Sequence, residues 1–178
     1  MTHRLSLLVV VALAFAACKP AAGLDLSGYP GTEDGAKQLL SAARTTDPRA
    51  LTLALRPTTA DYQAVYVDGA AAGMEAGFNG HIWNDPKAVI APRPENTELV
   101  VSKIASDELA AWSPQAVMEF PGGYKRVGPK LRPGLTVYRW KYTKPGELVG
   151  QSYDGLIYVN HRWAWFPKPW LVVDGQGT

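Results

Sequence analysis

The sequence LTVYRWKYTKPGELVGQSYDGLIYVNHRWAWF, residues 135–166, decides the fold of this chain. It contains three runs rich in aromatic and β-branched residues, as strands are, at Leu135–Thr143, Leu148–Val159 and Arg162–Phe166. Proline and glycine in Lys144–Glu147 occupy the positions that type II turns favour, and Asn160-His161 is a connection suited to a tight hairpin. Because strands joined by such short turns must be antiparallel, the stretch predicts three neighbouring antiparallel strands.

One further candidate strand lies upstream of these three. Glu98–Ile104 has the pattern of a strand, and Ser106 could cap a short helix after it. The glycines and prolines between Pro121 and Gly134 then predict an irregular loop. The C-terminal half is therefore expected to form a sheet of about four strands.

The N-terminal half has the pattern of helices. Thr32 can cap a helix whose first turn carries Glu33 and Asp34, acidic residues that are favourable near the positive end of the helix dipole. Asp47-Pro48 is a second start signal, a capping residue followed by proline at the first helical position. Thr59 can cap a third helical segment, so the sequence predicts three N-terminal helices.

The third helical segment contains three glycines in its second half, at positions 69, 73 and 77. Each glycine lowers helix stability by ~1 kcal/mol relative to alanine. The segment therefore either breaks near Asp68-Gly69 or continues as one helix with a weak second half, whose small-residue face packs closely against a neighbour. We expect the single helix.

These elements predict an α+β fold, in which N-terminal helices pack on one face of a C-terminal antiparallel sheet. The predicted organisation is a signal peptide at 1–17, a lipidated cysteine and flexible tether at 18–31, one domain at 32–170 and a tail at 171–178. The order of elements resembles the cone-shaped fold of the nuclear transport factor two-like superfamily. That resemblance implies a pocket enclosed by helices and a curved sheet, in a superfamily of isomerases, dehydratases and non-catalytic binding domains, so it does not settle function.

The first residues have the pattern of an export signal. Met1–Arg4 is a short basic start, and Leu5–Ala17 is apolar apart from Ser6. A helix of that length rises roughly 20 Å, which is short of the ~30 Å hydrocarbon core of a bilayer. The pattern therefore predicts a signal peptide rather than a membrane span.

Phe15-Ala16-Ala17-Cys18 resembles the lipobox of bacterial lipoproteins, with phenylalanine where that family usually has leucine. The resemblance implies cleavage before a cysteine that carries diacylglycerol on its sulfur. Ordinary signal peptidase cleavage after Ala14-Phe15-Ala16 is the alternative. Because Cys18 is the only cysteine, and a free thiol is a liability in an oxidising compartment, lipidation is the better reading. Lys19 in place of aspartate further implies an outer-membrane location if the organism has one, so we expect a lipid-anchored protein of the cell envelope.

Composition narrows the functional classes. A net charge of +2 is too small for a nucleic-acid binder, and a single cysteine leaves no pair for a disulfide. No zinc, calcium, Walker or dinucleotide motif occurs, so neither a metal nor a cofactor is predicted.

The best candidates for catalysis are His81 and Asp85. His81 could act as a general base near neutral pH, with Asp85 orienting it. The same stretch also has the composition of a turn followed by a helix cap, in which His81 would satisfy only a backbone carbonyl. We favour the turn.

Aromatic residues are unusually dense in the C-terminal part. Trp83, Tyr138, Trp140 and Trp170 are candidates for ligand contacts, because flat aromatic faces stack on apolar and ring-shaped ligands. The alternative is that the rings fill a core under the sheet, which we favour because aromatic residues are common in strands. Two prolines before Trp170 predict an extended segment that docks this ring on the domain or on a partner.

The sequence therefore predicts a non-catalytic domain that binds a small molecule or an envelope protein, with the membrane reached through lipid on Cys18. A small hydrolase or isomerase using His81 and Asp85 in a cone-fold pocket is the alternative. An assembly role is a third possibility, and it would require a contiguous exposed apolar patch.

Overall fold

The structure is a computed structural model that describes residues 24–173. The predicted signal peptide, Cys18 and the first part of the predicted tether lie outside the described residues, as do residues 174–178. No helix within the described range is long and apolar enough to cross a membrane.

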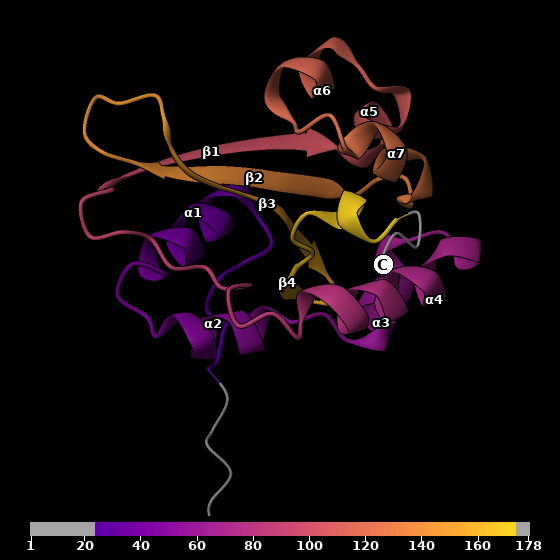
Figure 1. The fold of residues 1–178 in the computed structure, drawn as a ribbon, viewed down its shortest axis with the longest axis horizontal. Coiled ribbons are helices and arrows are strands. Elements are labelled where there is room, and N and C mark those ends of the chain that lie inside the picture. The colour runs from indigo at the N-terminus through magenta and orange to yellow at the C-terminus, as the bar shows by residue number, and fades with distance from the viewer. Residues whose placement is uncertain (1–23, 174–178) are drawn as a thin grey trace, which may run out of the picture.

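A four-stranded sheet with the order β1-β2-β3-β4 forms the centre of the molecule (Figure 1). The strands are β1 (Glu98–Ala105), β2 (Thr136–Thr143), β3 (Gly150–Val159) and β4 (Arg162–Trp165). All neighbours are antiparallel, so the predicted α+β class is confirmed. The turn between β3 and β4 consists of Asn160 and His161, both with positive φ as a tight type I′ hairpin requires.

Helices precede β1 and fill the connection between β1 and β2. They are α1 (Glu33–Ala42), α2 (Pro48–Leu55), α3 (Thr59–Val65), α4 (Asp68–Gly77), α5 (Ser106–Ala111), α6 (Pro114–Glu119) and α7 (Tyr124–Val127). A π-helical turn η1 (Phe78–Ile82) follows α4, and two 3₁₀ turns, η2 (Gly128–Lys130) and η3 (Pro169–Leu171), follow α7 and β4. The predicted caps are correct for the first two helices: Thr32 Oγ1 accepts from Gly35 N, and an Asp47 carboxylate oxygen accepts from Ala50 N.

The expectation of one helix beginning at Thr59 is wrong. Thr58, not Thr59, caps α3 in a capping box with Asp61, and the helix ends at Val65. Tyr66 is extended and bridges to Leu131, so a long-range backbone contact replaces the hydrogen bonds that would continue the helix. The helix breaks at Tyr66, two residues before Asp68-Gly69. This is close to the position at which the glycines indicated a possible break.

The region expected to be an irregular loop also contains structure. α7 and η2 lie within residues 121–134, and α6 comes just before them, with Ser113 Oγ accepting from Ala116 N as its cap. Ser106 does not cap α5 but is its first residue, and its Oγ accepts from Leu135 N. The Ser106 hydroxyl therefore bonds to the residue that precedes β2 instead of capping its own helix, whereas α6 begins at a local cap.

Helices cover both faces of the sheet, which corrects the expectation of a single covered face. One face carries Tyr138, Trp140, Tyr142, Leu156, Trp163 and Trp165, which pack with buried residues of α1 and α2. The other carries Ile104, Val137, Ile157 and Ala164, which pack with α3, α4, α5 and α7. Figure 1 shows α1 and α2 below the sheet and α5–α7 above one end of it. Two apolar clusters, one on each face, therefore make up the core.

A β-bulge at Gly155 sets which face the residues of β3 point to. Tyr138 pairs with Leu156 and Arg139 with Asp154, so Gly155 is the extra residue. Its φ is +82°, and a Cβ there would lie 2.0 Å from the carbonyl oxygen of Phe166, so only glycine fits.

Both ends of the folded unit extend beyond the predicted 32–170. Tyr29 accepts a hydrogen bond on its carbonyl oxygen from Trp163 Nε1, and Leu26 packs on the cluster under α1 and α2. Gly31 lies against the ring of Tyr158. At the other end, Val172 is buried in the core. The described part of the predicted tether is therefore docked on the domain.

Candidate functional site

A pocket of about 340 Å³ opens beside the part of β3 that has no β4 partner. β4 pairs only with Leu156–Val159, so residues 150–154 of β3 are flanked by other segments. Those segments are the loop after η1 and the chain that follows β4. The pocket is lined by Ile82, Asp85, Lys87, Ala88, Val89, Ser152, Tyr153, Trp165, Pro167, Lys168 and Leu171.

Two aromatic rings form the inner wall of this pocket and are fixed by their neighbours. The rings of Trp165 and Tyr153 have centroids 6.4 Å apart, and Tyr153 stacks on Trp140 at 5.3 Å. The Tyr153 hydroxyl also accepts a hydrogen bond from Ala91 N at 3.2 Å. On its other side Trp165 contacts Trp83 at 6.1 Å. The apolar wall is therefore preformed.

Three charged residues lie on the pocket: Asp85, Lys87 and Lys168. The Asp85 carboxylate accepts a hydrogen bond from Lys87 N at 2.8 Å and so closes a local turn. Lys168 has a φ of +47° and donates its backbone N–H to the Asp154 carboxylate at 3.1 Å. Neither lysine has an ion-pair partner within residues 24–173.

Asp154 lies behind this pocket, on the opposite side of β3 from Tyr153. Its side chain is buried, and the Tyr124 hydroxyl donates a hydrogen bond to it at 3.0 Å. Burial raises the pKa of Asp154 to about 6, against the opposing effects of the hydrogen bonds from Tyr124 and Lys168 and of nearby positive charge. One carboxylate thus joins β3, α7 and the segment that carries Lys168.

The variant Asp154→Asn should change the pH dependence of stability. Because the pKa is about 6 in the folded chain and ordinarily 3.8, the favourable contribution of the protonated carboxyl is fully present below pH 3.8. That contribution is lost as the pH rises through about 6. The wild type should therefore gain about 2 kcal/mol relative to the variant when the pH falls from 7 to 4. Urea unfolding at several pH values measures this difference.

The matched control is Glu147→Gln, in an exposed turn where the side chain has no hydrogen bond or ion pair with any described residue. Its stability should run parallel to that of the wild type across the same range. Parallel curves for Asp154→Asn as well would contradict the account of Asp154.

The structure does not assemble His81 and Asp85 into an acid–base pair. His81 is exposed in η1, and it shares no hydrogen bond or ion pair with Asp85 within the described range. Asp85 lines the pocket, but its carboxylate is engaged by the turn. The conformation of residues 81–85 is therefore explained by the local turn and not by an acid–base pair.

The four aromatic candidates lie in different surroundings. Tyr138 and Trp140 are buried in the core under α1 and α2, and neither lines the pocket beside β3. Trp83 is half-buried, donates Nε1–H to the Tyr62 hydroxyl at 3.0 Å and lies under the Arg56 guanidinium. Trp170 docks on the domain, with its ring 5.4 Å from that of Tyr124 and against Gly123.

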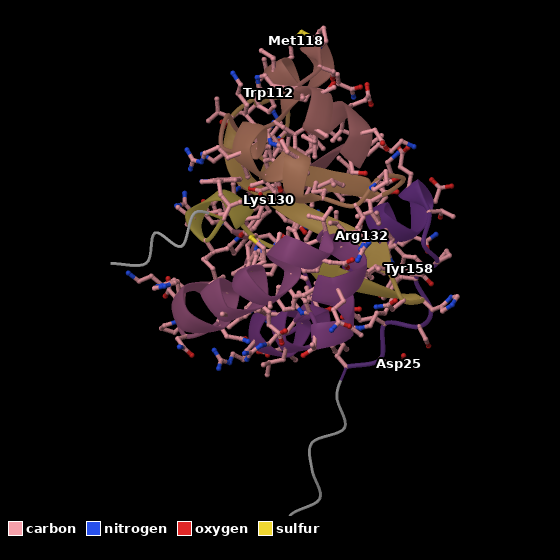
Figure 2. The ribbon with its side chains drawn as sticks, turned by 90° about the vertical axis from the view of Figure 1, so that its right-hand side faces the viewer. Asp25, Trp112, Met118, Lys130, Arg132 and Tyr158 are labelled. Carbon is pink, nitrogen blue, oxygen red and sulfur yellow. The ribbon has the colours of Figure 1, made fainter. Side chains whose placement is uncertain are left out.

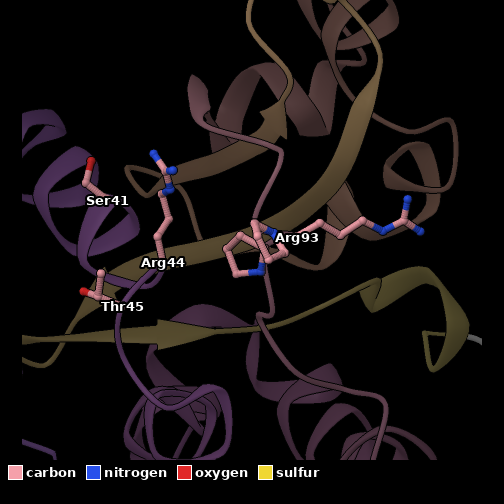
Figure 3. Close-up of a pocket in the computed structure, with 6 residues that line it drawn as sticks. Ser41, Arg44, Thr45 and Arg93 are labelled. Atoms are coloured by element: carbon pink, nitrogen blue, oxygen red, sulfur yellow. The ribbon is translucent and has the colours of Figure 1, made fainter.

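A second hollow, of about 350 Å³, is lined by Ser41, Arg44, Thr45, Pro92, Arg93 and Pro94 (Figure 3). In Figure 3 the side chains of Arg44 and Arg93 extend in different directions. Arg44 donates a hydrogen bond to the carbonyl oxygen of Thr97. The hollow also lies beside the C-terminal end of α1, whose dipole disfavours an anion. It is therefore the weaker candidate for a binding site.

Sequence reasoning named Asp85 but missed the rest of the pocket. Its walls come from three segments far apart in the chain, and no local motif marks them. One signal was present for Asp154, because an Asp-Gly pair inside a strand pattern indicates a bulge. Among residues 24–173, no group of three or more His, Cys, Asp or Glu side chains is placed to hold a metal ion.

Comparison with known proteins assigns no family. No family model and no solved structure matches the chain. A 53-residue stretch is 36% identical to the fatty acid synthase beta subunit hexB of Dothistroma septosporum. The match covers 30% of this chain and spans only 3% of that protein, so it carries no conclusion about fold or function. The resemblance to the cone-shaped fold stays a prediction.

Proposed function

We propose that this protein is a lipid-anchored cell-envelope protein whose domain binds a small ligand, without catalysis, in the pocket beside β3. The observation that carries the proposal is the preformed aromatic wall of Trp165 and Tyr153 inside a pocket of about 340 Å³. Ligand pockets of proteins are mostly apolar, with a few polar groups, and measure roughly 300–1,000 Å³. The pocket is suited to a small ligand.

The polar groups around the pocket favour binding over chemistry. Asp85 is engaged by the backbone of Lys87, and His81 does not line the pocket. Asp154 also lies outside the lining and is held by Tyr124 and Lys168. A general base must lie within hydrogen-bond reach of the proton that it removes, and of these three groups only Asp85 lines the pocket, where it has no histidine or second carboxylate as a partner among the described residues.

The envelope location rests on the sequence. The basic start, the apolar run to Ala17 and the lone Cys18 support export followed by lipidation. Stable anchoring requires more than one acyl chain, as bacterial lipoproteins usually carry.

The variant Cys18→Ala should lose both acyl incorporation and membrane retention. Metabolic labelling with a fatty acid, followed by separation of membrane and soluble fractions, measures both. The control is Phe15→Leu, which brings the sequence closer to the usual lipobox and should stay labelled. Continued acyl incorporation into Cys18→Ala would overturn the proposed anchor.

Filling the pocket should abolish ligand binding without unfolding the domain. The neutral probe 4-phenylbutan-1-ol should bind the wild type with a dissociation constant of about 4 mM, given about 0.3 kcal/mol per heavy atom. Nuclear magnetic resonance titration should show shifts at Ala88, Val89 and Leu171. Ser152→Phe should remove them because the new ring occupies the pocket, and Ser102→Phe, in β1 outside the pocket, should not. Equal binding of the probe by the two variants would show that the proposed pocket is not the binding site.

A further inference from the structure

The charges on the pocket are unbalanced in favour of cations. Lys87 and Lys168 both line it, and the only carboxylate in the lining belongs to Asp85. That carboxylate is turned to the backbone N–H of Lys87 at 2.8 Å. Neither ammonium group forms an ion pair among residues 24–173. The Lys168 charge acts on Asp154 behind the pocket, where it lowers the pKa of that carboxyl, and the lining itself carries two positive charges against the one negative charge of Asp85.

Lys168 is held in position by its neighbours. It lies between Pro167 and Pro169, both buried, and its own backbone is left-handed, with a φ of +47°. The Asp154 carboxylate accepts its backbone N–H, and its carbonyl oxygen accepts from Leu171 N. Because prolines restrict the backbone and both backbone groups are bonded, the side chain leaves from a fixed point on the pocket rim.

The mouth of the pocket also carries uncovered apolar surface. Leu171 is 46% exposed and lines the pocket together with the partly buried Ile82 and Val89. These side chains lie on the same pocket as the rings of Trp165 and Tyr153. A ligand with an apolar body would cover this surface, and burial of apolar area favours binding.

We propose that the pocket selects an amphipathic anion, with its apolar body against the Trp165–Tyr153 wall and its anionic group between Lys87 and Lys168. This inference rests on the proposed binding function and names its ligand class. A carboxylate or a phosphate monoester on a small ring or short chain has the required chemistry. Two lysines attract either group as point charges, and they impose no planar geometry of the kind that arginine does.

Three probes of one shape and different charge test the selection: 4-phenylbutyrate, 4-phenylbutan-1-ol and 4-phenylbutylamine. A partly exposed ion pair contributes ~0.7 kcal/mol, about threefold in affinity, so two pairs should favour the carboxylate over the alcohol by about tenfold. The amine should bind most weakly. Added salt should weaken the binding of the carboxylate and leave the binding of the alcohol unchanged.

Lysine variants locate the anionic group. Lys87→Gln and Lys168→Asn should each reduce the preference for carboxylate over alcohol to about threefold. Asparagine is chosen at 168 because it tolerates the left-handed backbone. Lys144→Gln, in the exposed turn between β2 and β3 and outside the pocket, should leave the preference unchanged. Binding of the alcohol to each variant reports that the pocket is still formed.

The possible outcomes distinguish anion selection from the proposed small-ligand binding on which it rests. Equal binding of the three probes, or tightest binding of the amine, would overturn anion selection while small-ligand binding stands. An unchanged preference in both lysine variants would overturn the assignment of the cations. Binding of none of the probes would remove the proposed function itself.

Discussion

Replacing Gly155 with alanine should destabilise the protein by about 3 kcal/mol or more. The φ of +82° already disfavours any side chain, and the added Cβ would lie 2.0 Å from the carbonyl oxygen of Phe166. Phe166 cannot withdraw freely, because its N–H donates to Gly155 O at 2.8 Å. For a domain of this size the melting temperature should fall by about 6–12 °C, which calorimetry or circular dichroism measures.

Gly146→Ala is the matched control. Gly146 has a φ of +72°, but nothing lies within 4 Å of the position of its Cβ. The Gly146→Ala variant should therefore lose only the stability that a side chain costs at a positive φ, about 1–2 kcal/mol. If Gly155→Ala proved no worse than Gly146→Ala, the close approach of β3 to the chain after β4 would be wrong.

Replacing Arg162 with methionine should cost about 3 kcal/mol. The guanidinium forms an ion pair with Asp61, whose side chain is only 1% exposed, and donates to the carbonyl oxygens of Ala54 and Arg56. Methionine retains the apolar stem but leaves the Asp61 charge buried without its cation and the end of α2 without a donor. Denaturant unfolding at pH 7 measures the loss.

Two further variants separate the charge from the packing. Arg49→Met removes an exposed arginine of α2 that has no hydrogen bond or ion pair with any described residue, and it should have an effect within about 0.5 kcal/mol. The double variant with Asp61→Asn should recover part of the loss, because no buried charge is then left uncompensated. Full additivity of the two substitutions would contradict this explanation.

The sequence predicted what short-range chemistry determines. The antiparallel pairing follows from the turns themselves, because Asn160-His161 is too short for any crossover. Caps at Thr32 and Asp47 bond to backbone groups three residues away, so their helix starts could be located without knowledge of the fold.

The predictions that failed depend on contacts between distant residues. Nothing near Tyr66 in the sequence indicates Leu131, yet their bridge ends α3. Likewise the candidate pocket combines the loop after η1, the free part of β3 and the chain after β4. His81 and Asp85 show the converse, because closeness along the chain did not bring their side chains together.

The docking of Leu26 and Tyr29 on the domain has a consequence for where the protein can act. Under the proposed lipidation, only residues 18–23 separate the bilayer from the folded unit, and they reach at most about 20 Å when fully extended. Figure 2 shows Asp25 at one end of the molecule and Met118, on α6, at the other. The domain would therefore remain in a thin layer at the membrane surface, so that any ligand or partner has to come to it there.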